Sequence, residues 1–433
     1  MHHRIVIEKI ISGGRGLGRL PDGMVVMVDH VLPGERIEVR ITREHKGYCE
    51  GRPERIVSPA PGRVTPSCPL HGLCGGCDLQ HAAYPLQLEI KKQIVHDCLE
   101  RILGRGSGEL VADPIASPKE TGYRSRIRLQ LDQEGAPGFF QPRSHRLVPA
   151  KQCLLVSPDM NRVLADLHHG DLARISAVCR EIELLKSPQD GKLFCILSLH
   201  GNGDISPAAI RDTISALIPG QVFVRRKKKL QPITPDTDPA VLQQRLTLDS
   251  GGSCTLSWSP ECFSQINPEQ NQQLVKAVCR VAGEVRGCSL LDLYCGIGNF
   301  SIPLGLLGAR VTGIERSRPS IVWAKKNRTA AGLDQARFLA VDATRGLRDL
   351  ARNKERFNCI LLDPPRQGMG RDISLLPGLG PEKIIYVSCD PATLARDLRI
   401  LTRDGRFRLT RVLPVDMFPQ THHIESVAVL EKN

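Results

Sequence analysis

Aromatic residues are scarce in this chain of 433 residues, because 10 Phe, 5 Tyr and 2 Trp make up only 4% of it. No stretch reaches the roughly 18 uninterrupted apolar residues that a membrane-spanning helix needs, and Met1–Glu8 lacks the apolar core of a secretory signal. Sequence repeats are also absent. We therefore expect a cytoplasmic protein with no membrane partner.

Cysteine and positive charge, in contrast, are abundant. The chain has 15 cysteines, and its 59 Lys and Arg against 46 Asp and Glu give a net charge of +13. Disulfides are not expected in a reducing compartment, so these cysteines are packing residues, metal ligands or nucleophiles. The positive charge indicates a polyanionic partner, and because the excess is spread along the chain it is not a disordered basic tail. Its densest run, residues 225–229, is either a solvated hairpin tip or a phosphate-contacting patch, and a nucleic-acid substrate favours the patch.

The N-terminal part alternates β-rich segments with Gly and Pro turns, which predicts a small closed β-barrel over residues 1–57. A Pro-rich linker then leads into a mixed α+β central domain over residues 58–262. In this domain we expect a helix over 86–103. Its candidate strands are 126–131, 193–199 and 221–224.

The last part, residues 263–433, alternates short apolar runs with helix-like segments. The runs are 289–293, 310–314, 337–341, 358–362 and 383–387. This alternation is typical of a doubly wound, mainly parallel sheet. The expected fold class is a multidomain α/β protein with an additional barrel.

Three cysteines lie close together in a Gly-rich segment, Cys68, Cys74 and Cys77, with the spacing C-x5-C-x2-C. Cys153 is the best candidate for a fourth ligand from elsewhere in the chain. Three close cysteines and a distant one suit a [4Fe–4S] cluster, and tetrahedral zinc is the competing interpretation. Ligand spacing alone decides little between these two.

A cofactor signal lies in residues 290–300, where an apolar strand carrying Asp292 leads into the turn Tyr294-Cys295-Gly296-x-Gly298 and then a helix. A dinucleotide loop would carry the full G-x-G-x-x-G, so the turn favours S-adenosylmethionine over NAD. Glu315 ends the next strand and is suited to accept hydrogen bonds from ribose hydroxyls. Asp342 ends the third strand and is suited to the adenine amino group.

Two further strand ends carry reactive groups. Asp363-Pro364-Pro365-Arg366 follows the fourth apolar run, and Ser388-Cys389-Asp390-Pro391 follows the fifth. A cysteine at the carboxyl edge of a parallel sheet faces the ligand crevice. We expect the dipole of the following helix to lower the pKa of the Cys389 thiol.

Four motifs in residues 263–427 resemble the RNA uracil-C5 methyltransferase family. They are Phe263-x-Gln265-x-Asn267, Asp363-Pro364-Pro365-Arg366-x-Gly368, Ser388-Cys389-Asp390-Pro391-x-Thr393-x-Ala395-Arg396-Asp397-Leu398, and Gln420-Thr421-His422-His423-Ile424-Glu425-Ser426-Val427. The N-terminal barrel with Leu32-Pro33-Gly34-Glu35 is similar to a TRAM domain, and the four cysteines match the iron–sulfur centre of the family. Together, these parts are most similar to the family members that act on 23S ribosomal RNA.

The resemblance implies a mechanism. Uracil C5 is a poor nucleophile, and attack of the Cys389 thiolate on C6 moves electron density to C5. C5 then takes the methyl group, and Glu425 is the expected base that removes the C5 proton before the thiol leaves. Asp363 is suited to uracil N3–H. By the same resemblance, the cofactor-binding residues are Gln265, Tyr294, Asn299, Glu315, Asp342 and Asp363.

The expected partner is RNA, whose target base must leave its stack to meet the thiol, and the chain is expected to act as a monomer. Within the family, transfer RNA is the alternative substrate. A non-catalytic RNA-binding assembly factor would need a lost catalytic residue, and none of Asp363, Cys389 or Glu425 is missing. DNA is not expected as a substrate. An adenine N6 methyltransferase typically has an aromatic residue after the Pro-Pro pair, where this chain has Arg366. A DNA cytosine methyltransferase typically has its nucleophile after Pro-Pro, where this chain has none.

Overall fold

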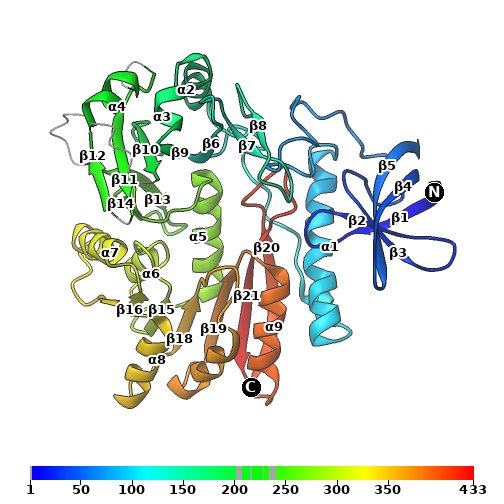
Figure 1. Cartoon of the computed structure of the whole chain (residues 1–433). Coiled ribbons are helices and arrows are strands. Elements are labelled where there is room, and N and C mark those ends of the chain that lie inside the picture. Colours follow the sequence, from blue (N-terminus) through cyan, green and yellow to red (C-terminus); the bar gives the residue numbers. More distant parts are fainter. Residues whose placement is uncertain (1, 201–206, 215–216, 228, 234–239) are drawn as a thin grey trace.

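Five strands at the N-terminus close into a barrel in the order β1-β2-β3-β5-β4, as the sequence predicts (Figure 1). The computed structural model describes residues 2–200, 207–214, 217–227, 229–233 and 240–433. The barrel strands are β1 (His2–Ile10), β2 (Gly16–Arg19), β3 (Val25–Val28), β4 (Arg36–His45) and β5 (Tyr48–Ser58). Neighbouring strands are antiparallel except for the parallel pair β3–β5.

Strand β2 was not expected, because its glycines look like turn residues. A Cβ on Gly16 would lie 2.3 Å from the Val31 side chain, and a Cβ on Gly18 would lie 2.7 Å from the Val6 carbonyl. These glycines therefore serve close packing inside a narrow barrel rather than a turn.

Buried Glu35 fastens the barrel to the linker that follows it. Its carboxylate accepts hydrogen bonds from the backbone N–H groups of Leu32 (2.8 Å) and Ala60 (3.2 Å) and from the Arg63 guanidinium (2.5 Å). These contacts hold the pKa of the Glu35 carboxyl below its usual range against the opposing effect of burial. The acidic residue of the Leu32–Glu35 motif is thus a structural anchor.

The central part contains a seven-stranded sheet in the order β12-β11-β10-β9-β6-β7-β8. Its strands are β6 (Arg126–Leu131), β7 (Pro137–Phe140), β8 (Leu147–Pro149), β9 (Cys179–Lys186), β10 (Leu193–Leu199), β11 (Gln221–Arg226) and β12 (Lys229–Pro232). The helices here are α1 (Tyr84–Leu103), η1 (Ser107–Leu110), α2 (Pro158–His169), α3 (Ala173–Ser176) and α4 (Pro207–Ile214), and the hairpin β13 (Leu242–Thr247)–β14 (Ser253–Trp258) follows the sheet.

The basic run lies at the hairpin between β11 and β12, where Arg226 pairs with Lys229. Lys228 lies outside the described residues. Arg225 is bound to the buried Glu183 carboxylate at 3.2 Å. The run is therefore the predicted hairpin tip, and contact with phosphates stays a prediction.

The C-terminal sheet has the order β17-β16-β15-β18-β19-β21-β20. Strands β15 (Ser289–Leu293), β16 (Arg310–Glu315), β17 (Arg337–Ala340), β18 (Cys359–Leu362) and β19 (Lys383–Ser388) are parallel, which confirms the predicted doubly wound fold. Strands β20 (Phe407–Val415) and β21 (Glu425–Lys432) add an antiparallel pair at one edge. The helices are α5 (Pro268–Ala282), α6 (Ser301–Leu306), α7 (Arg318–Ala330), α8 (Ala343–Arg352), η2 (Gly370–Leu379) and α9 (Pro391–Thr402).

Alternate strand residues of this sheet enter two separate cores. Leu290 and Leu361 pack with α5, α6 and α7 on one face. Leu291 and Ile360 pack with α1, α8, α9 and η2 on the other. Parallel strands covered on both faces are expected to be apolar throughout, which explains why these strands were recognisable as continuous runs.

Helix α1 lies between the barrel and the C-terminal sheet (Figure 1). It packs chiefly on α9. Its Lys91 side chain is completely buried and binds Asp416, which is equally buried, at 2.5 Å. Lys91 also donates to the Phe418 carbonyl (3.0 Å), and the Tyr84 hydroxyl donates to Asp416 (2.8 Å). In the described part of the chain, every helix is too short or too polar to cross a membrane.

Replacing Lys91 by Ala is expected to lower the free energy of unfolding by about 3–5 kcal/mol, because the Asp416 carboxylate stays buried without its partner. Chemical denaturation monitored by circular dichroism measures this change. The matched control is Lys92→Ala, which removes the ion pair to the exposed Asp113 and is expected to leave the free energy of unfolding nearly unchanged, because solvent screens exposed ion pairs. Equal effects of the two substitutions would contradict the anchoring role of Lys91.

Candidate active site

A cleft of about 810 Å³ lies at the carboxyl ends of the parallel strands. Its volume is within the usual range for small-molecule sites. The structure brings all of the predicted catalytic and cofactor residues together on its wall. They are Gln265, Tyr294, Asn299, Glu315, Asp342, Asp363, Cys389 and Glu425.

The turn after β15 has an unusual backbone. Tyr294 adopts a left-handed conformation with φ +64°, followed by Gly296 at +53° and Gly298 at +93°. A positive φ costs a tyrosine roughly 1–3 kcal/mol, and such strain concentrates at ligand-binding sites. The turn thus presents the Tyr294 side chain and a small glycine surface to the cleft.

The acidic residues around this turn differ in their burial and in their hydrogen-bond partners. Glu315 accepts a hydrogen bond from the Ser317 N–H (2.6 Å), and Asp342 caps α8 by accepting from the Thr344 N–H (3.0 Å). Asp292 does not line the cleft: it lies within β15, completely buried, and accepts the Ser301 hydroxyl at 2.5 Å. Burial raises the pKa of Asp292 to about 7.

Asn299 is held by a reciprocal amide pair with Asn271 of α5. Each side-chain amide donates to the carbonyl oxygen of the other, at 2.9 and 3.0 Å. Two residues of the motif that precedes α5, Phe263 and Asn267, differ in their exposure to solvent. Phe263 is 67% exposed on the cleft wall, whereas Asn267 is completely buried and caps α5 through the Gln270 N–H.

The reactive end of the cleft holds Asp363, Cys389 and Glu425, with Arg366 beside them. Removal from water raises the pKa of both the Asp363 and the Glu425 carboxyl, and each is a source of negative charge near Cys389. The Glu425 side chain is 4% exposed, and its Oε2 atom has no hydrogen-bond partner. With its pKa raised to about 8, the Glu425 carboxyl is ionised in a fraction of the molecules near neutral pH, and in that form it can accept a proton from a ligand.

The expected lowering of the Cys389 pKa is wrong. Burial, followed by the charge of Glu425, raises the pKa of the thiol to about 11, although Arg366 opposes the shift. Asp390 caps α9 through the Thr393 N–H (2.8 Å), and its negative charge raises the thiol pKa further. Burial together with the acidic neighbours therefore keeps the free thiol protonated at neutral pH.

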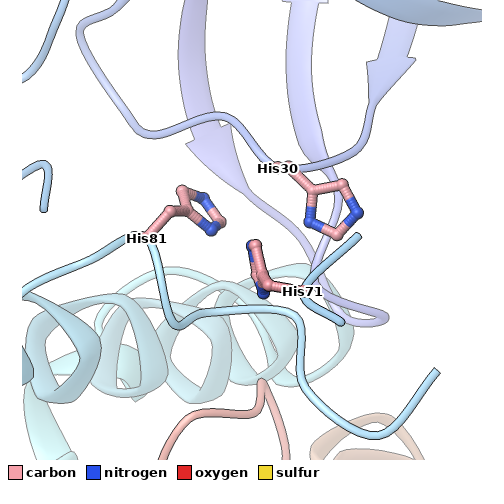
Figure 2. A group of neighbouring side chains, drawn as sticks. All are labelled: His30, His71 and His81. Carbon is pink, nitrogen blue, oxygen red and sulfur yellow. The ribbon is translucent and has the colours of Figure 1, made fainter. Parts of the chain in front are cut away.

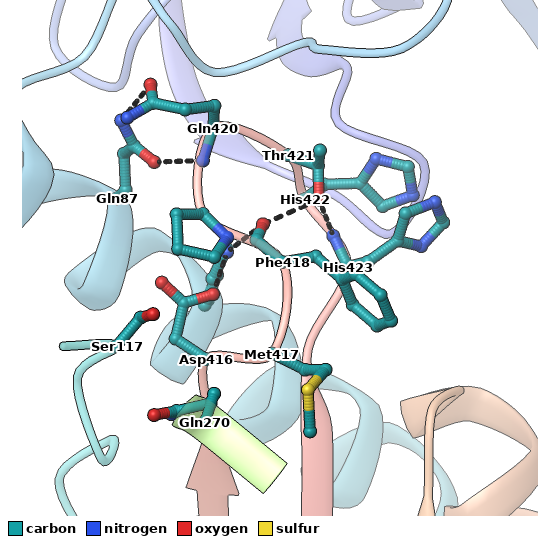
Figure 3. A network of polar contacts seen from close by, with 12 residues as sticks. Gln87, Ser117, Gln270, Asp416, Met417, Phe418, Gln420, Thr421, His422 and His423 are labelled. Carbon is teal, nitrogen blue, oxygen red and sulfur yellow. Dashed lines mark hydrogen bonds and ion pairs between the residues drawn. The ribbon is translucent and has the colours of Figure 1, made fainter. Parts of the chain in front are cut away.

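The loop from Asp416 to Ile424 carries the chain to Glu425, and a network of polar contacts fixes it (Figure 3). Gln87 of α1 donates to the Gln420 side chain (3.0 Å) and accepts the Gln420 N–H (2.8 Å). Within the loop, the Thr421 hydroxyl donates to the Phe418 carbonyl (2.8 Å) and accepts the His423 N–H (3.2 Å). Gln420 takes a left-handed φ of +71°, so the loop is held in a conformation that its sequence alone does not favour.

Asp78, directly after Cys77, contacts the same loop. Its carboxylate accepts the backbone N–H of His422 at 2.7 Å and also contacts Nδ1 of the His422 ring. Asp78 and His422 are 344 positions apart in the sequence, so no local pattern indicates their contact. Gly14 of the barrel packs here as well: a Cβ on it would lie 2.7 Å from the Asp78 carboxylate. The barrel, the cysteine segment and the loop that leads to Glu425 therefore meet at Asp78.

The four candidate ligand cysteines gather next to this contact. Cys74 is within electrostatic reach of Cys68 and Cys153, and Cys77 is within reach of Cys74 and Cys153. The Gly76 N–H donates to the Cys74 sulfur at 3.3 Å. All 15 cysteines are free thiols, which agrees with the expectation of no disulfides.

Other proteins are similar to this chain in both sequence and architecture. The family described as tRNA (Uracil-5-)-methyltransferase matches residues 221–433, and the TRAM domain matches residues 3–53. The structure of Pyrococcus abyssi tRNA (uracil-54, C5)-methyltransferase in complex with S-adenosyl-L-homocysteine superimposes with a TM-score of 0.73 and 25% identity over 99% of both chains. The fold and the cleft thus define an S-adenosylmethionine-dependent methyltransferase.

Relatives with similar sequences span the whole chain. A 23S rRNA (uracil(1939)-C(5))-methyltransferase of Acidithiobacillus ferrooxidans is 34% identical over 99% of this chain and 97% of that protein. The protein of the same description from Shewanella amazonensis is 34% identical over 98% and 94%. An RNA methyltransferase of Halalkalibacterium halodurans is 31% identical over 99% and 96%. The chain belongs to the RNA uracil-C5 methyltransferase family, which sets aside the DNA, adenine and non-catalytic alternatives.

Replacing Asp78 by Ala is expected to lower kcat for RNA methylation by about tenfold or more, because small displacements of catalytic groups are costly and the loop before Glu425 loses two contacts. Asp78→Asn keeps an acceptor for the His422 N–H and is expected to lose less. Radiolabelled methyl transfer measures both rates. Asp113→Ala, at an exposed acid, is the control, and unchanged turnover in Asp78→Ala would contradict the role of Asp78 in positioning the loop.

Proposed function

We propose that this enzyme methylates C5 of a uridine in 23S ribosomal RNA through a covalent adduct with Cys389. The observation that carries the proposal is one cleft that holds a thiol, two carboxyls of raised pKa and the cofactor loop. The printed descriptions of the full-length relatives support the ribosomal substrate. Transfer RNA is the second candidate, and the description of the P. abyssi structure favours it.

The first step of the proposed mechanism is transfer of the Cys389 proton to a water molecule of the cleft. Since the free thiol has a pKa of about 11, the bound substrate must stabilise the thiolate that remains. Arg366 is the positive group within electrostatic reach of the thiol and favours its ionised form. The thiolate then adds to C6 of the uracil ring, which makes C5 nucleophilic.

Bound S-adenosylmethionine supplies the methyl group that C5 takes. Glu425 then removes the C5 proton, the C5–C6 double bond re-forms, and the Cys389 thiolate leaves. A base works best when its pKa lies near the working pH, and burial of Glu425 shifts its pKa in that direction. We assign Asp363, which stays partly protonated for the same reason, to hold the polar edge of the uracil ring.

The remaining residues on the wall suit the cofactor. We propose that Glu315 accepts the ribose hydroxyls, that Asp342 faces the adenine amino group, and that Gln265, Tyr294, Asn299 and Asp363 complete the site. All of them line the cleft. Phe263, exposed at the same wall, offers an aromatic face for a base that has left its stack.

We also propose a [4Fe–4S] cluster on Cys68, Cys74, Cys77 and Cys153. Support comes from their mutual approach and from the N–H donor on Cys74, since hydrogen bonds to sulfur are usual in such centres. The half-buried Arg124 adds a positive charge near Cys77 and Cys153. Among the described residues, the four thiols do not form a group tight enough for one ion, which favours a cluster over zinc.

We propose that three consecutive parts of the chain have different roles. Residues 1–57 hold RNA, residues 58–262 carry the cluster, and residues 263–433 bind the cofactor and perform catalysis. Because one chain builds the complete cleft, we propose that it acts as a monomer.

RNA that contains 5-fluorouridine is expected to form a stable adduct with the wild-type enzyme, because fluorine at C5 cannot leave as a proton. Cys389→Ala is expected to form none, and Glu425→Gln is expected to accumulate an adduct even on unmodified RNA. Denaturing gel electrophoresis with a 23S rRNA fragment and with transfer RNA measures all three outcomes.

Cys288→Ala is the matched control, since Cys288 is partly buried at the opposite end of β15. An adduct in Cys389→Ala would contradict the proposed nucleophile. An adduct with transfer RNA alone would contradict the ribosomal substrate while leaving the chemistry intact.

Anaerobically purified protein is expected to be brown and to contain about four irons per chain. Cys74→Ser and Cys153→Ser are expected to lose this colour and iron, whereas Cys98→Ser, at a buried cysteine of α1, keeps both. Visible absorbance and elemental analysis provide the measurement. A colourless protein with stoichiometric zinc on these cysteines would contradict the cluster.

A further inference from the structure

Three histidines face one another where the barrel meets the cysteine segment (Figure 2). His30 lies in the loop after β3, His71 lies between Cys68 and Cys74, and His81 precedes α1. One ring nitrogen from each lies within 4.8 Å of the other two. The ring centroids are 4.8 Å apart for His30 and His71, and 5.5 Å apart for His71 and His81.

Four ring nitrogens of these histidines are buried and have no protein partner in the described part of the chain. They are Nδ1 of His30, both nitrogens of His71 and Nδ1 of His81. The His81 residue is only 2% exposed. Buried polar atoms are nearly always satisfied in folded proteins, so four unpaired ring nitrogens in one place require an explanation.

His81 is also oriented in the manner of a metal ligand. Its Nε2 atom lies 3.3 Å from the Val31 carbonyl, and since only a protonated nitrogen can donate there, Nε2 carries the hydrogen. The lone pair of Nδ1 is then directed to the shared space. Metal-bound histidines typically have this arrangement, in which the second nitrogen donates to a carbonyl or carboxylate and fixes the tautomer.

The electrostatic setting keeps the rings neutral. Burial lowers the pKa of His71 to about 4 and that of His81 to about 3, and it also lowers the pKa of His30. A neutral imidazole is the form that binds metal. The nearby carboxylates have other partners, because Asp29 binds Arg143 at 2.7 Å and Asp78 binds His422.

We propose that His30, His71 and His81 form a divalent metal site, best suited to Zn²⁺, with water as the fourth ligand. Zinc prefers four ligands in a tetrahedron and binds imidazole nitrogen at about 2.0–2.1 Å, which places ligand nitrogens about 3.4 Å apart. The histidines reach this spacing when each ring moves by about 1 Å toward the centre. Imidazole ligands also suit copper and nickel, so the site is defined by its nitrogen donors rather than by one element.

The site would connect parts that the chain otherwise joins through a linker. The metal would hold the His30 loop of the barrel to the segment that carries Cys68, Cys74 and Cys77. It is separate from the proposed cluster, since its ligands are nitrogens, and it does not depend on the proposed methylation of ribosomal RNA.

Zinc binding to the full-length protein, iron-loaded and treated with a chelator, tests the site. Titration calorimetry with Zn²⁺ is expected to give one equivalent for the wild type, and His30→Ala, His71→Ala and His81→Ala are each expected to lose it. His169→Ala is the matched control at an exposed histidine of α2 and is expected to keep it. Circular dichroism shows whether each metal-free variant is folded.

A second measurement distinguishes nitrogen from sulfur ligands. Co²⁺ added to cluster-free Cys68→Ser/Cys74→Ser protein is expected to show visible ligand-field bands without thiolate charge-transfer absorption, and His71→Ala is expected to abolish them. Zinc binding that survives in His71→Ala, or that disappears only when cysteines are replaced, overturns the proposal. Failure of the wild-type protein to bind zinc also overturns the proposal.

Discussion

The ion pair of Lys91 and Asp416 is the contact on which much of this molecule depends. Neither side chain touches water, so each charge requires the other, and removing one leaves a buried charge without compensation. The pair joins α1, which precedes the central sheet, to the loop that leads into Glu425. Around it, the Tyr84 hydroxyl and the Phe418 carbonyl complete the hydrogen bonds. A loop near the end of the chain is thereby fixed by a helix near its start.

The same loop is the meeting point of the other parts. Asp78 reaches it from the cysteine segment, and Gly14 brings the barrel against Asp78. Because Glu425 follows this loop directly, its position in the cleft depends on elements that do no chemistry. The cysteine segment is connected to the loop before Glu425 by direct contacts, from Cys77 to Asp78 to His422.

The parts that could be predicted from the sequence are those specified by local pattern. The parallel strands are uninterrupted apolar runs, and a cleft at their carboxyl ends follows from the fold. The positions of Glu315 and Asp363 on the wall of this cleft were predictable in this way. The unpredicted features need partners brought from far away. The Asp78–His422 contact spans 344 positions. The pKa of Cys389 is raised by burial and by the charges of Glu425 and Asp363, which lie elsewhere in the sequence.

The raised pKa of Cys389 also makes its thiol less reactive toward oxidants and alkylating agents before substrate binds. Oxidants and alkylating agents attack the thiolate far faster than the thiol. A thiol with a pKa of about 11 is almost entirely protonated at neutral pH, so it is slow to form a sulfenic acid. Burial and the acidic neighbours that raise this pKa therefore protect the thiol from oxidation while the cleft is free of RNA.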